Sequence, residues 1–431
     1  MSDRFKVTSD PTIAGDILRL CFAVLALFGC YLLVIDSARS GFARLLCTAA
    51  IIQSQVEPAD RAVSWAPSDP ETHYTRALSL INAERVDEAL AELQIATRLR
   101  PYHYYEWLDL GVTLDRLGDN AAAESAIRES VRLAPTFAQP HWQLGNLLYR
   151  AKRYPEAFDE LRLGARSNPN LREGWIRLAW AAADENPAKL VALVQPQQKY
   201  DHFMLARLLA SAGQGADAVE QVRLGGAASD EDDRNMLRVT IIQLINTRQF
   251  LSALDVWKFS HSVSTNDAGN GQIINGDFLG PVVREDPGFG WQLTNIPRVS
   301  VAIDVNGPAA GSRSLRVDFN GEVPRAAVIN QLVLLKPASR YSLRFMAKAE
   351  KLVSGGLPII MATEIDSGAA QVLGQSQPLG AEGNGWAPYQ FEFSTLKSTA
   401  VVFSLQRQQC SENQCPIFGT LWLSHFSLAK L

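Results

Sequence analysis

The feature that most constrains the fold is a set of four prolines at a constant spacing. Pro67, Pro101, Pro135 and Pro169 follow one another at intervals of 34 residues. A fixed period of this length is typical of repeat architectures, in which each unit buries its apolar face against its neighbours. Because proline does not continue a helix, each of these prolines predicts a helix end followed by a turn. The period therefore predicts a stack of helical units.

Other residues recur in phase with the prolines, and small residues among them allow two helices to approach closely. This pattern resembles the tetratricopeptide repeat, whose paired antiparallel helices stack into a solenoid. The resemblance is clearest over residues 70–183, and over residues 188–260 we expect two or three divergent helical hairpins. The residues in phase are His73, Arg76, Ala77 and Ala89; Trp107, Leu110, Gly111 and Ala123; His141, Leu144, Gly145 and Ala157; and Trp175, Leu178 and Ala179.

The resemblance also implies a partner-binding groove, which this family builds from fixed positions on the first helix of each repeat. Counting units from Pro70 places aromatic and polar side chains there, which suits a peptide or a glycan that stacks on rings. Packing against the neighbouring helix is an equally open interpretation for Trp142 and Tyr149, and is favoured for Trp180. The predicted groove residues are Tyr74, Tyr105, Trp142, Asn146, Tyr149 and Arg150.

An apolar run lies near the N-terminus. From Ile17 to Ile35 the only charged residue is Arg19. As a helix this run is about 28 Å long, close to the hydrocarbon thickness of a bilayer. We predict an uncleaved transmembrane helix over residues 17–36, preceded by a cytoplasmic tail of residues 1–16. A cleaved signal peptide and a buried helix of a soluble protein are the alternatives.

Basic residues give the predicted orientation. Arg4, Lys6 and Arg19 precede the end of the apolar run, whereas Arg39 and Arg44 follow it. Because basic residues favour the cytoplasmic side, this slight excess places the bulk of the chain outside the cytoplasm. The predicted localisation is a single-pass protein of the inner (cytoplasmic) membrane, with most of the chain periplasmic or otherwise extracytoplasmic.

Two cysteines, Cys410 and Cys415, lie close together in a polar segment. Their spacing allows a disulfide that closes a small loop in an oxidising compartment. Two free thiols in a reducing compartment are the alternative. A disulfide agrees with the orientation that the basic residues predict.

The composition changes after Phe259. Residues 261–271 are polar and read as a linker, and helical spacing disappears beyond them. Short alternating segments follow, and they predict about eight strands in an all-β, two-sheet jelly roll. Asn-Gly pairs at 306–307, 320–321 and 384–385 predict turns. The predicted strands are SLRVDF, INQLVLL, YSLRFMAKA, YQFEF, VVFSL and TLWLSHFSL.

Several short motifs occur in order along residues 272–431. The segments Ile274–Phe278, Gly290–Trp291, Tyr341–Phe345 and Gly419–Leu423 are among them. Together they resemble carbohydrate-binding modules with a galactose-binding-like jelly roll, nearly from end to end. Members of that family often carry an acidic residue near Ser424–His425 that contributes to a calcium site. Its absence here puts calcium in doubt, and we expect no metal and no cofactor.

The candidate sugar-binding residues are Gln331, Arg344 and Arg407. Alternation along the strand puts Arg344 on the polar face, and we expect Gln331 and Arg407 to lie on strands of the same sheet. Trp291 and Trp386 are more often core residues than stacking platforms in the family that this region resembles.

Composition and motifs exclude several function classes. The net charge of −4 shows no excess of basic residues, so nucleic acid is not an expected partner. The six histidines form no metal-spaced pair, and no nucleotide-binding loop or nucleophile elbow occurs. We therefore expect no enzymatic activity and no catalytic residues.

The sequence predicts a multidomain scaffold with a transmembrane helix, an all-α solenoid over residues 37–260 and a β-sandwich over residues 272–431. The first hypothesis is a bacterial envelope protein of exopolysaccharide assembly or export. In it the solenoid binds a protein or peptide and the sandwich binds a polysaccharide. The alternative is a protein-assembly factor whose sandwich is a structural or oligomerisation domain.

Overall fold

The structure is a computed structural model that describes residues 11–261, 271–282, 286–322, 326–365, 370–380, 385–396, 399–410 and 415–431. Its described residues form two compact units, one ending at Val194 and one beginning at Gln195. The helical and β-rich regions occur in the predicted order. The domain limits of 37–260 and 272–431 remain predictions, because the two units meet at a different place.

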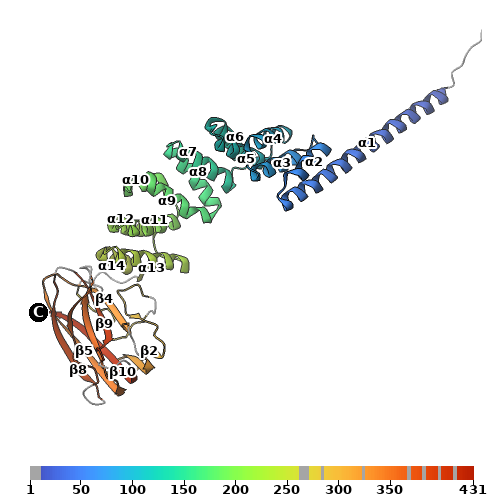
Figure 1. Cartoon of the computed structure of the whole chain (residues 1–431). Helices are drawn as coiled ribbons and strands as arrows, with labels where there is room; N and C mark the ends of the chain where they lie inside the picture. The colour runs from blue at the N-terminus through green and yellow to red at the C-terminus, as the bar shows by residue number, and fades with distance from the viewer. Residues whose placement is uncertain are drawn as a thin grey trace, which may run out of the picture. The chain divides into compact units, whose positions relative to one another are not determined.

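The first unit begins with a long helix, α1 (Pro11–Gln53), followed by α2 (Val56–Trp65). Figure 1 shows the N-terminal part of α1 projecting away from the repeats, whereas its C-terminal part lies against them. There Ala43, Cys47 and Ala50 are buried, and α1 contacts α2 and α3. By length and composition α1 could cross a membrane, and a signal sequence has the same properties.

Helical hairpins follow α1 and α2 in chain order (Figure 1). The first helices of the hairpins begin at residues 70, 104, 138 and 172, which confirms the 34-residue period. Within the first unit the elements are α3 (Pro70–Asn82), α4 (Val86–Leu99), α5 (Tyr104–Arg116), α6 (Asn120–Leu133), α7 (Ala138–Arg150), α8 (Tyr154–Ser167), the 3-10 helix η1 (Pro169–Leu171), α9 (Arg172–Ala182) and α10 (Pro187–Val194).

Small residues in phase with the period set how closely the helices of a hairpin pack. A Cβ atom on Gly111 would lie 2.4 Å from Cγ1 of Ile127, and one on Gly145 would lie 2.6 Å from Cγ of Leu161. Since heavy atoms do not approach this closely, a larger residue would force the two helices of the hairpin apart. Ala43, 34 residues before Ala77, is buried like it. The end of α1 therefore packs against the helices that follow through a small residue in phase with the repeats.

The second unit begins with two more hairpins, as expected from the sequence. They consist of α11 (Lys199–Ser211) with α12 (Gly215–Gly225), and α13 (Glu231–Asn246) with α14 (Phe250–His261). The period is lost here because α10 is a short helix, and α11 begins seven residues earlier than a 34-residue repeat would require.

The β-rich region contains two five-stranded antiparallel sheets. In order across the first sheet the strands are β1 (Gln292–Leu293), β4 (Ile329–Leu334), β9 (Ala400–Arg407), β6 (Pro358–Glu364) and β7 (Gln371–Gln375). In the second they are β2 (Val299–Asp304), β3 (Ser314–Glu322), β10 (Ile417–Lys430), β5 (Arg340–Val353) and β8 (Ala387–Ser394).

A continuous apolar core joins the two sheets. Phe403 of β9 and Phe345 of β5 belong to it, so the sheets pack face to face as a sandwich. The six predicted strands are confirmed, and β1, β2, β6 and β7 are additional. One predicted turn is wrong, because Asn320–Gly321 lies inside β3, where Gly321 has φ of +84° beside a register shift in the pairing. Asn384 of another predicted turn lies outside the described residues.

Candidate functional site

The first helices of the repeats carry the predicted groove residues, beginning with two tyrosines. The Tyr74 hydroxyl on α3 donates a hydrogen bond of 2.7 Å to Oδ2 of Asp109 on α5. Burial raises the pKa of Tyr74, which keeps the hydroxyl protonated as the donor. Tyr105 on α5 is 47% exposed, and its ring centroid lies 4.0 Å from that of Tyr104. Tyr105 is thus open to a partner, whereas Tyr74 ties two helices together.

Trp142 and Asn146 lie one turn apart on α7. The half-buried Trp142 ring reaches towards α9, where a Cβ atom on Gly174 would lie 3.3 Å from Cη2 of the indole. The Asn146 side-chain amide donates to the Trp142 carbonyl oxygen at 2.9 Å. The Trp142 ring therefore packs on the next repeat, although part of it remains exposed.

Tyr149 and Arg150 end the same helix and have different surroundings. The Tyr149 ring centroid lies 5.5 Å from that of Tyr154 and 6.1 Å from that of Phe158, both on α8. The exposed Arg150 forms an ion pair of 2.6 Å with Asp115 on α5. For Tyr149 the contacts favour the packing interpretation that the sequence left open, and the groove roles of all six residues remain predictions.

Two acidic residues that the sequence did not single out link neighbouring first helices. Asp109 accepts from Tyr74, and Asp115 pairs with Arg150. In each pair the two residues lie 35 positions apart, one more than the repeat period. A search of the sequence for polar residues spaced 35 positions apart would have found both pairs. These pairs link α3 to α5 and α5 to α7, and α5 also carries the exposed Tyr105.

Buried histidines recur at one repeat position and bind the turn that precedes their helix. Nδ1 of His73 lies 2.6 Å from Glu92 Oε2, and its Nε2 lies 2.9 Å from the Pro67 carbonyl oxygen. His141, two repeat periods later, has the equivalent partners. Its Nδ1 lies 2.6 Å from Glu160 Oε2, and its Nε2 lies 2.9 Å from the Pro135 carbonyl oxygen. These rings are therefore structural rather than metal ligands.

A buried carboxylate lies close to the exposed tyrosines. Glu106 is fully buried, and neither of its carboxylate oxygens accepts a hydrogen bond from the part of the chain that the structure describes. Arg100 Nη1 lies 3.3 Å and His103 Nδ1 3.6 Å from Oε1. Burial raises the pKa of Glu106 to about 7, against the opposing effect of Arg100. The residue therefore changes charge near neutral pH.

The candidate sugar-binding residues of the β-sandwich do not share one sheet. Arg344 lies on β5, whereas Gln331 on β4 and Arg407 on β9 belong to the other sheet. The prediction of a common sheet is wrong because β4 and β9 pair with each other and neither pairs with β5. Alternation alone fixes a face within a strand, but it does not say which strands are neighbours.

Gln331 is fully buried and serves the opening segment of the sandwich. Its side-chain oxygen accepts from the Ile274 amide at 3.1 Å, and its side-chain nitrogen donates to the Ile274 carbonyl at 2.9 Å. The same segment is fixed at Gly276, where a Cβ atom would lie 2.2 Å from the Phe426 carbonyl oxygen. Gln331 therefore acts as a structural clamp.

Arg407 is also held by protein groups, around a disulfide. The structure contains the predicted bond between Cys410 and Cys415, with Cα atoms 6.4 Å apart. The Arg407 guanidinium donates to the carbonyl oxygens of Gly356 at 3.1 Å and Cys415 at 2.6 Å, and to the Ser354 hydroxyl at 2.5 Å. Burial lowers the pKa of Arg407. This half-buried arginine holds the ends of the loop, and its predicted role in sugar binding remains a prediction.

Arg344 is the candidate that remains exposed. Its Nε donates to Gln390 Oε1 on β8 at 3.2 Å. On the same sheet the indole of Trp422 donates to Asp304 at 2.9 Å and lies beneath two cations, with Lys348 Nζ 4.8 Å from the ring centroid. We call this surface the Arg344 face: Arg344, Gln390, Lys348 and Trp422. Trp291, in contrast, is a core residue, whereas Trp386 is half-buried.

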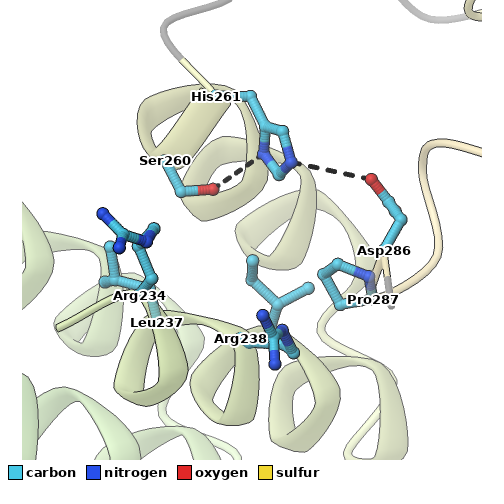
Figure 2. A pocket seen from close by; sticks show the side chains of 8 residues that line it. Arg234, Leu237, Arg238, Ser260, His261, Asp286 and Pro287 are labelled. Carbon is cyan, nitrogen blue, oxygen red and sulfur yellow. Dashed lines mark hydrogen bonds and ion pairs between the residues drawn. The ribbon is translucent and has the colours of Figure 1, made fainter. Parts of the chain in front are cut away.

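Figure 2 shows a pocket of about 220 Å³ that the sequence did not predict. It lies among α13, the end of α14 and the segment before β1. The lining residues are Arg234, Leu237, Arg238, Ile241, Ser260, His261, Asp286 and Pro287.

Charges in this pocket balance one another. Glu231 lies 2.8 Å from Arg234 and 3.8 Å from Arg238. The buried Asp286 accepts from Trp257 Nε1 at 3.0 Å and from the Gly288 and Gly290 amides at 2.9 Å each. The positive charges of Arg234 and Arg238 are therefore balanced by Glu231 and Asp286. The hydrogen bond between Asp286 and Trp257 joins α14 to the segment that leads into the β-sandwich.

Sequence comparison identifies the helical repeats. Residues 74–138 and 108–171 each match the family model described as a tetratricopeptide repeat. No curated protein matches the chain. The repeats over this range are thus tetratricopeptide repeats, which mediate protein–protein interaction.

Solved structures with some likeness to the chain include MamA, from residue 41 to its end, of Desulfovibrio magneticus RS-1. It is 14% identical, covers 37% of this chain and 97% of its own length, and has a TM-score of 0.32. YrrB, a TPR protein with an unusual peptide-binding site, is 17% identical, covers 39% of this chain and 88% of its own, and has a TM-score of 0.30. A structure titled "CBM4 structure and function" is 15% identical, covers 37% and 99%, and has a TM-score of 0.28.

Proposed function

We propose that this chain is a membrane-anchored, non-enzymatic scaffold of a bacterial envelope. Its repeats bind a protein or peptide, and its β-sandwich, a jelly roll resembling a carbohydrate-binding module, binds a polysaccharide during exopolysaccharide assembly or export. The observation that carries the proposal is the joining of tetratricopeptide repeats to a long exposed apolar helix on one side and a β-sandwich on the other.

The repeat surface supports the partner-binding half of the proposal. The pairs Tyr74–Asp109 and Asp115–Arg150 hold the first helices in place, so Tyr105 is presented on a fixed frame. A partly exposed aromatic ring on a fixed frame is the type of residue that contributes most to protein interfaces. The partner is a peptide or protein segment with an apolar side chain that covers this ring.

Photo-crosslinking in cells tests this half. A benzophenone amino acid replaces Tyr105 on the first-helix face or Leu163, an exposed residue of α8 on a second helix. We expect a discrete adduct from position 105 and none from position 163. Equal adducts from both positions, or none from either in an abundant folded protein, would show that the partner does not bind at the first-helix face around Tyr105.

The Arg344 face supports the polysaccharide half. A guanidinium beside an amide oxygen can hydrogen-bond the hydroxyl groups of a sugar, and both Arg344 and Gln390 are exposed. The Trp422 ring is only 9% exposed beneath Lys348 and Arg316, so the sugar contacts on this face come from the polar groups and not from stacking.

A glycan array with the full chain tests the polysaccharide half. Arg344→Ala should remove the binding, and Arg298→Ala, an exposed arginine that precedes β2, should retain it. Binding that survives Arg344→Ala would place the sugar elsewhere.

A protein-assembly factor is the second candidate function. The side chains of Gln331 and Arg407 form hydrogen bonds within the sandwich, which leaves Arg344 as the exposed residue among the three sugar-binding candidates. This favours the protein-assembly function. The absence of glycan binding by a folded, full-length protein would support this candidate and leave the repeat surface as the functional site.

A further inference from the structure

The part of α1 beyond the apolar run has three distinct faces. One face packs into the repeats through Ala43, Cys47 and Ala50, which are buried. A second face carries Arg44 and Thr48, which are exposed and polar. The third face is apolar and outward. Its members recur at alternating intervals of three and four residues: Ile35, Ala38, Phe42, Leu45, Ala49 and Ile52. We call these six residues the α1 stripe.

The α1 stripe is exposed in the single chain. Phe42 is 46% exposed, Leu45 67% and Ile52 78%. Trp65 of α2 adds to its edge, with its ring centroid 5.0 Å from that of Phe42. The terminal unit of a soluble solenoid normally presents a polar outer face. The end of α1, which packs against α2 and α3 ahead of the repeats, does the opposite, so the stripe needs a covering surface.

A bilayer does not reach along the whole stripe. At 1.5 Å per residue, Ile52 lies about 26 Å along the helix from Ile35, where the apolar run ends. The headgroup layer adds only about 5–7 Å, and transmembrane helices tilt on average by about 20°. Lipid therefore covers the start of the stripe and leaves Leu45 and Ile52 in water.

The spacing of the stripe selects the kind of partner. Alternation of three and four residues is the heptad pattern by which two helices wrap around each other with a left-handed supercoil. The pattern continues backwards into the apolar run at Tyr31, Phe28, Val24 and Cys21. In copies anchored in one membrane with the same orientation, the stripes run parallel to each other and lie at the same distance from the membrane. Confinement to the membrane also raises their effective concentration.

The residues that flank the stripe are compatible with self-pairing. Gly41 and Thr48 lie on one side of it and Arg39 and Leu46 on the other. In a parallel pair these two sides face each other, so Arg39 of one copy lies beside small or apolar residues of the second and not beside its Arg39. No like charges therefore meet across the seam.

We infer that two copies of this chain associate in parallel through the α1 stripe. The inference rests on the proposed function in one respect, because it requires α1 to remain uncleaved as a membrane anchor. The pairing places two sets of repeats side by side at the membrane, each with its own partner-binding surface.

Disulfide crosslinking of the full chain in membranes tests the pairing. In a background with Cys21→Ser, Cys30→Ser and Cys47→Ala, a cysteine is introduced by Leu45→Cys on the stripe or, as the matched control, by Ile51→Cys, at an exposed residue beside Arg44 that lies outside the stripe and its flanks. Mild oxidation should give a covalent dimer with Leu45→Cys and at least fivefold less with Ile51→Cys. Leu45→Glu should convert the detergent-solubilised dimer to a monomer in light scattering, whereas Ile51→Glu should not.

Two further readouts separate the pairing from the anchor. Intact mass and resistance to alkaline extraction report whether α1 is retained in the membrane. An anchored, intact chain that gives equal or no crosslinking at the two positions overturns the pairing and leaves the proposed function standing. A chain that has lost α1 overturns the anchor and the pairing together.

Discussion

Nδ1 of His141 lies 2.6 Å from a carboxylate oxygen of Glu160 on the second helix of the same repeat. The other ring nitrogen faces the Pro135 carbonyl oxygen at 2.9 Å. Both partners are acceptors, so both nitrogens carry protons when both bonds form. The fold therefore favours the imidazolium, and the bond to Glu160 is the main reason that the pKa of His141 is raised.

We predict that His141 makes this repeat less stable at alkaline pH. A histidine whose pKa is raised on folding stabilises fully below its unfolded value, near 6.5, and the stabilisation is lost as pH rises through the folded value. Between pH 6 and pH 9 the opening free energy of α7 and α8 should fall by on the order of 1 kcal/mol. Hydrogen exchange, compared between variants at the same pH, measures it.

The control uses a residue that the chain itself places at the equivalent position. Trp107 donates a single hydrogen bond to the Pro101 carbonyl oxygen at 2.8 Å, without a titrating group. His141→Trp should therefore flatten the pH dependence of α7 and α8. An unchanged dependence in this variant would show that another group is responsible.

We predict the same direction of pH dependence for Glu106, from a different cause. Burial raises its pKa to about 7, so the carboxyl enters the folded state most easily when protonated. Stability is highest below the unfolded pKa near 4.5 and falls as pH rises through 7, by on the order of 2–3 kcal/mol. Glu106→Gln should remove this loss in urea unfolding of the repeats at pH 5 and pH 8. Glu129→Gln, at a residue paired with Arg132 on the surface, should not.

The repeat region was predictable because its signal is periodic and local. Prolines, small residues and ring-bearing residues at fixed offsets define helix ends and close contacts within one unit of 34 residues. The structure departs from this pattern where the unit itself changes, at the short helix α10. In the β-region, alternation identified long strands such as β5, whereas the two-residue strand β1 carried no signal.

The candidate site was less predictable because its decisive contacts are distant in sequence. Gln331 binds Ile274, 57 positions away, and Arg407 binds Gly356, 51 positions away. An exposed arginine on a polar face and one that closes a loop look alike in a single sequence. Asp109 and Asp115, in contrast, lie at the period plus one, so the repeat could have indicated them.

We predict that Asp286 couples α14 to the β-sandwich (Figure 2). Its carboxylate accepts from Trp257, Gly288 and Gly290, and His261 Nε2 lies 3.6 Å away. Asp286→Ala leaves these buried donors without an acceptor, at a cost of about 2–4 kcal/mol. Calorimetry of the full chain should show the sandwich melting at a lower temperature.

The matched control for Asp286 is Asp277, which lies in the opening segment of the same sandwich. Its carboxylate accepts only a long bond of 3.3 Å from the Leu279 amide among the contacts the structure describes. Asp277→Ala should therefore leave the melting temperature within about 2 °C of wild type. A similar loss in both variants would show that any acidic residue of this segment matters, and not the bond to Trp257.

We predict that Arg407 and Arg344 differ in what they contribute to the sandwich. Arg407→Ala removes donors to two carbonyl oxygens and a hydroxyl beside the disulfide, so it should lower the melting temperature of the sandwich. Arg344→Ala removes one exposed bond to Gln390 and should change stability by less than about 0.5 kcal/mol. Thermal unfolding followed by circular dichroism in the β-region measures both. If Arg344→Ala were as destabilising as Arg407→Ala, loss of glycan binding by the Arg344 variant could no longer be assigned to a lost sugar contact. If Arg407→Ala were neutral, the closing role assigned to its guanidinium would be wrong.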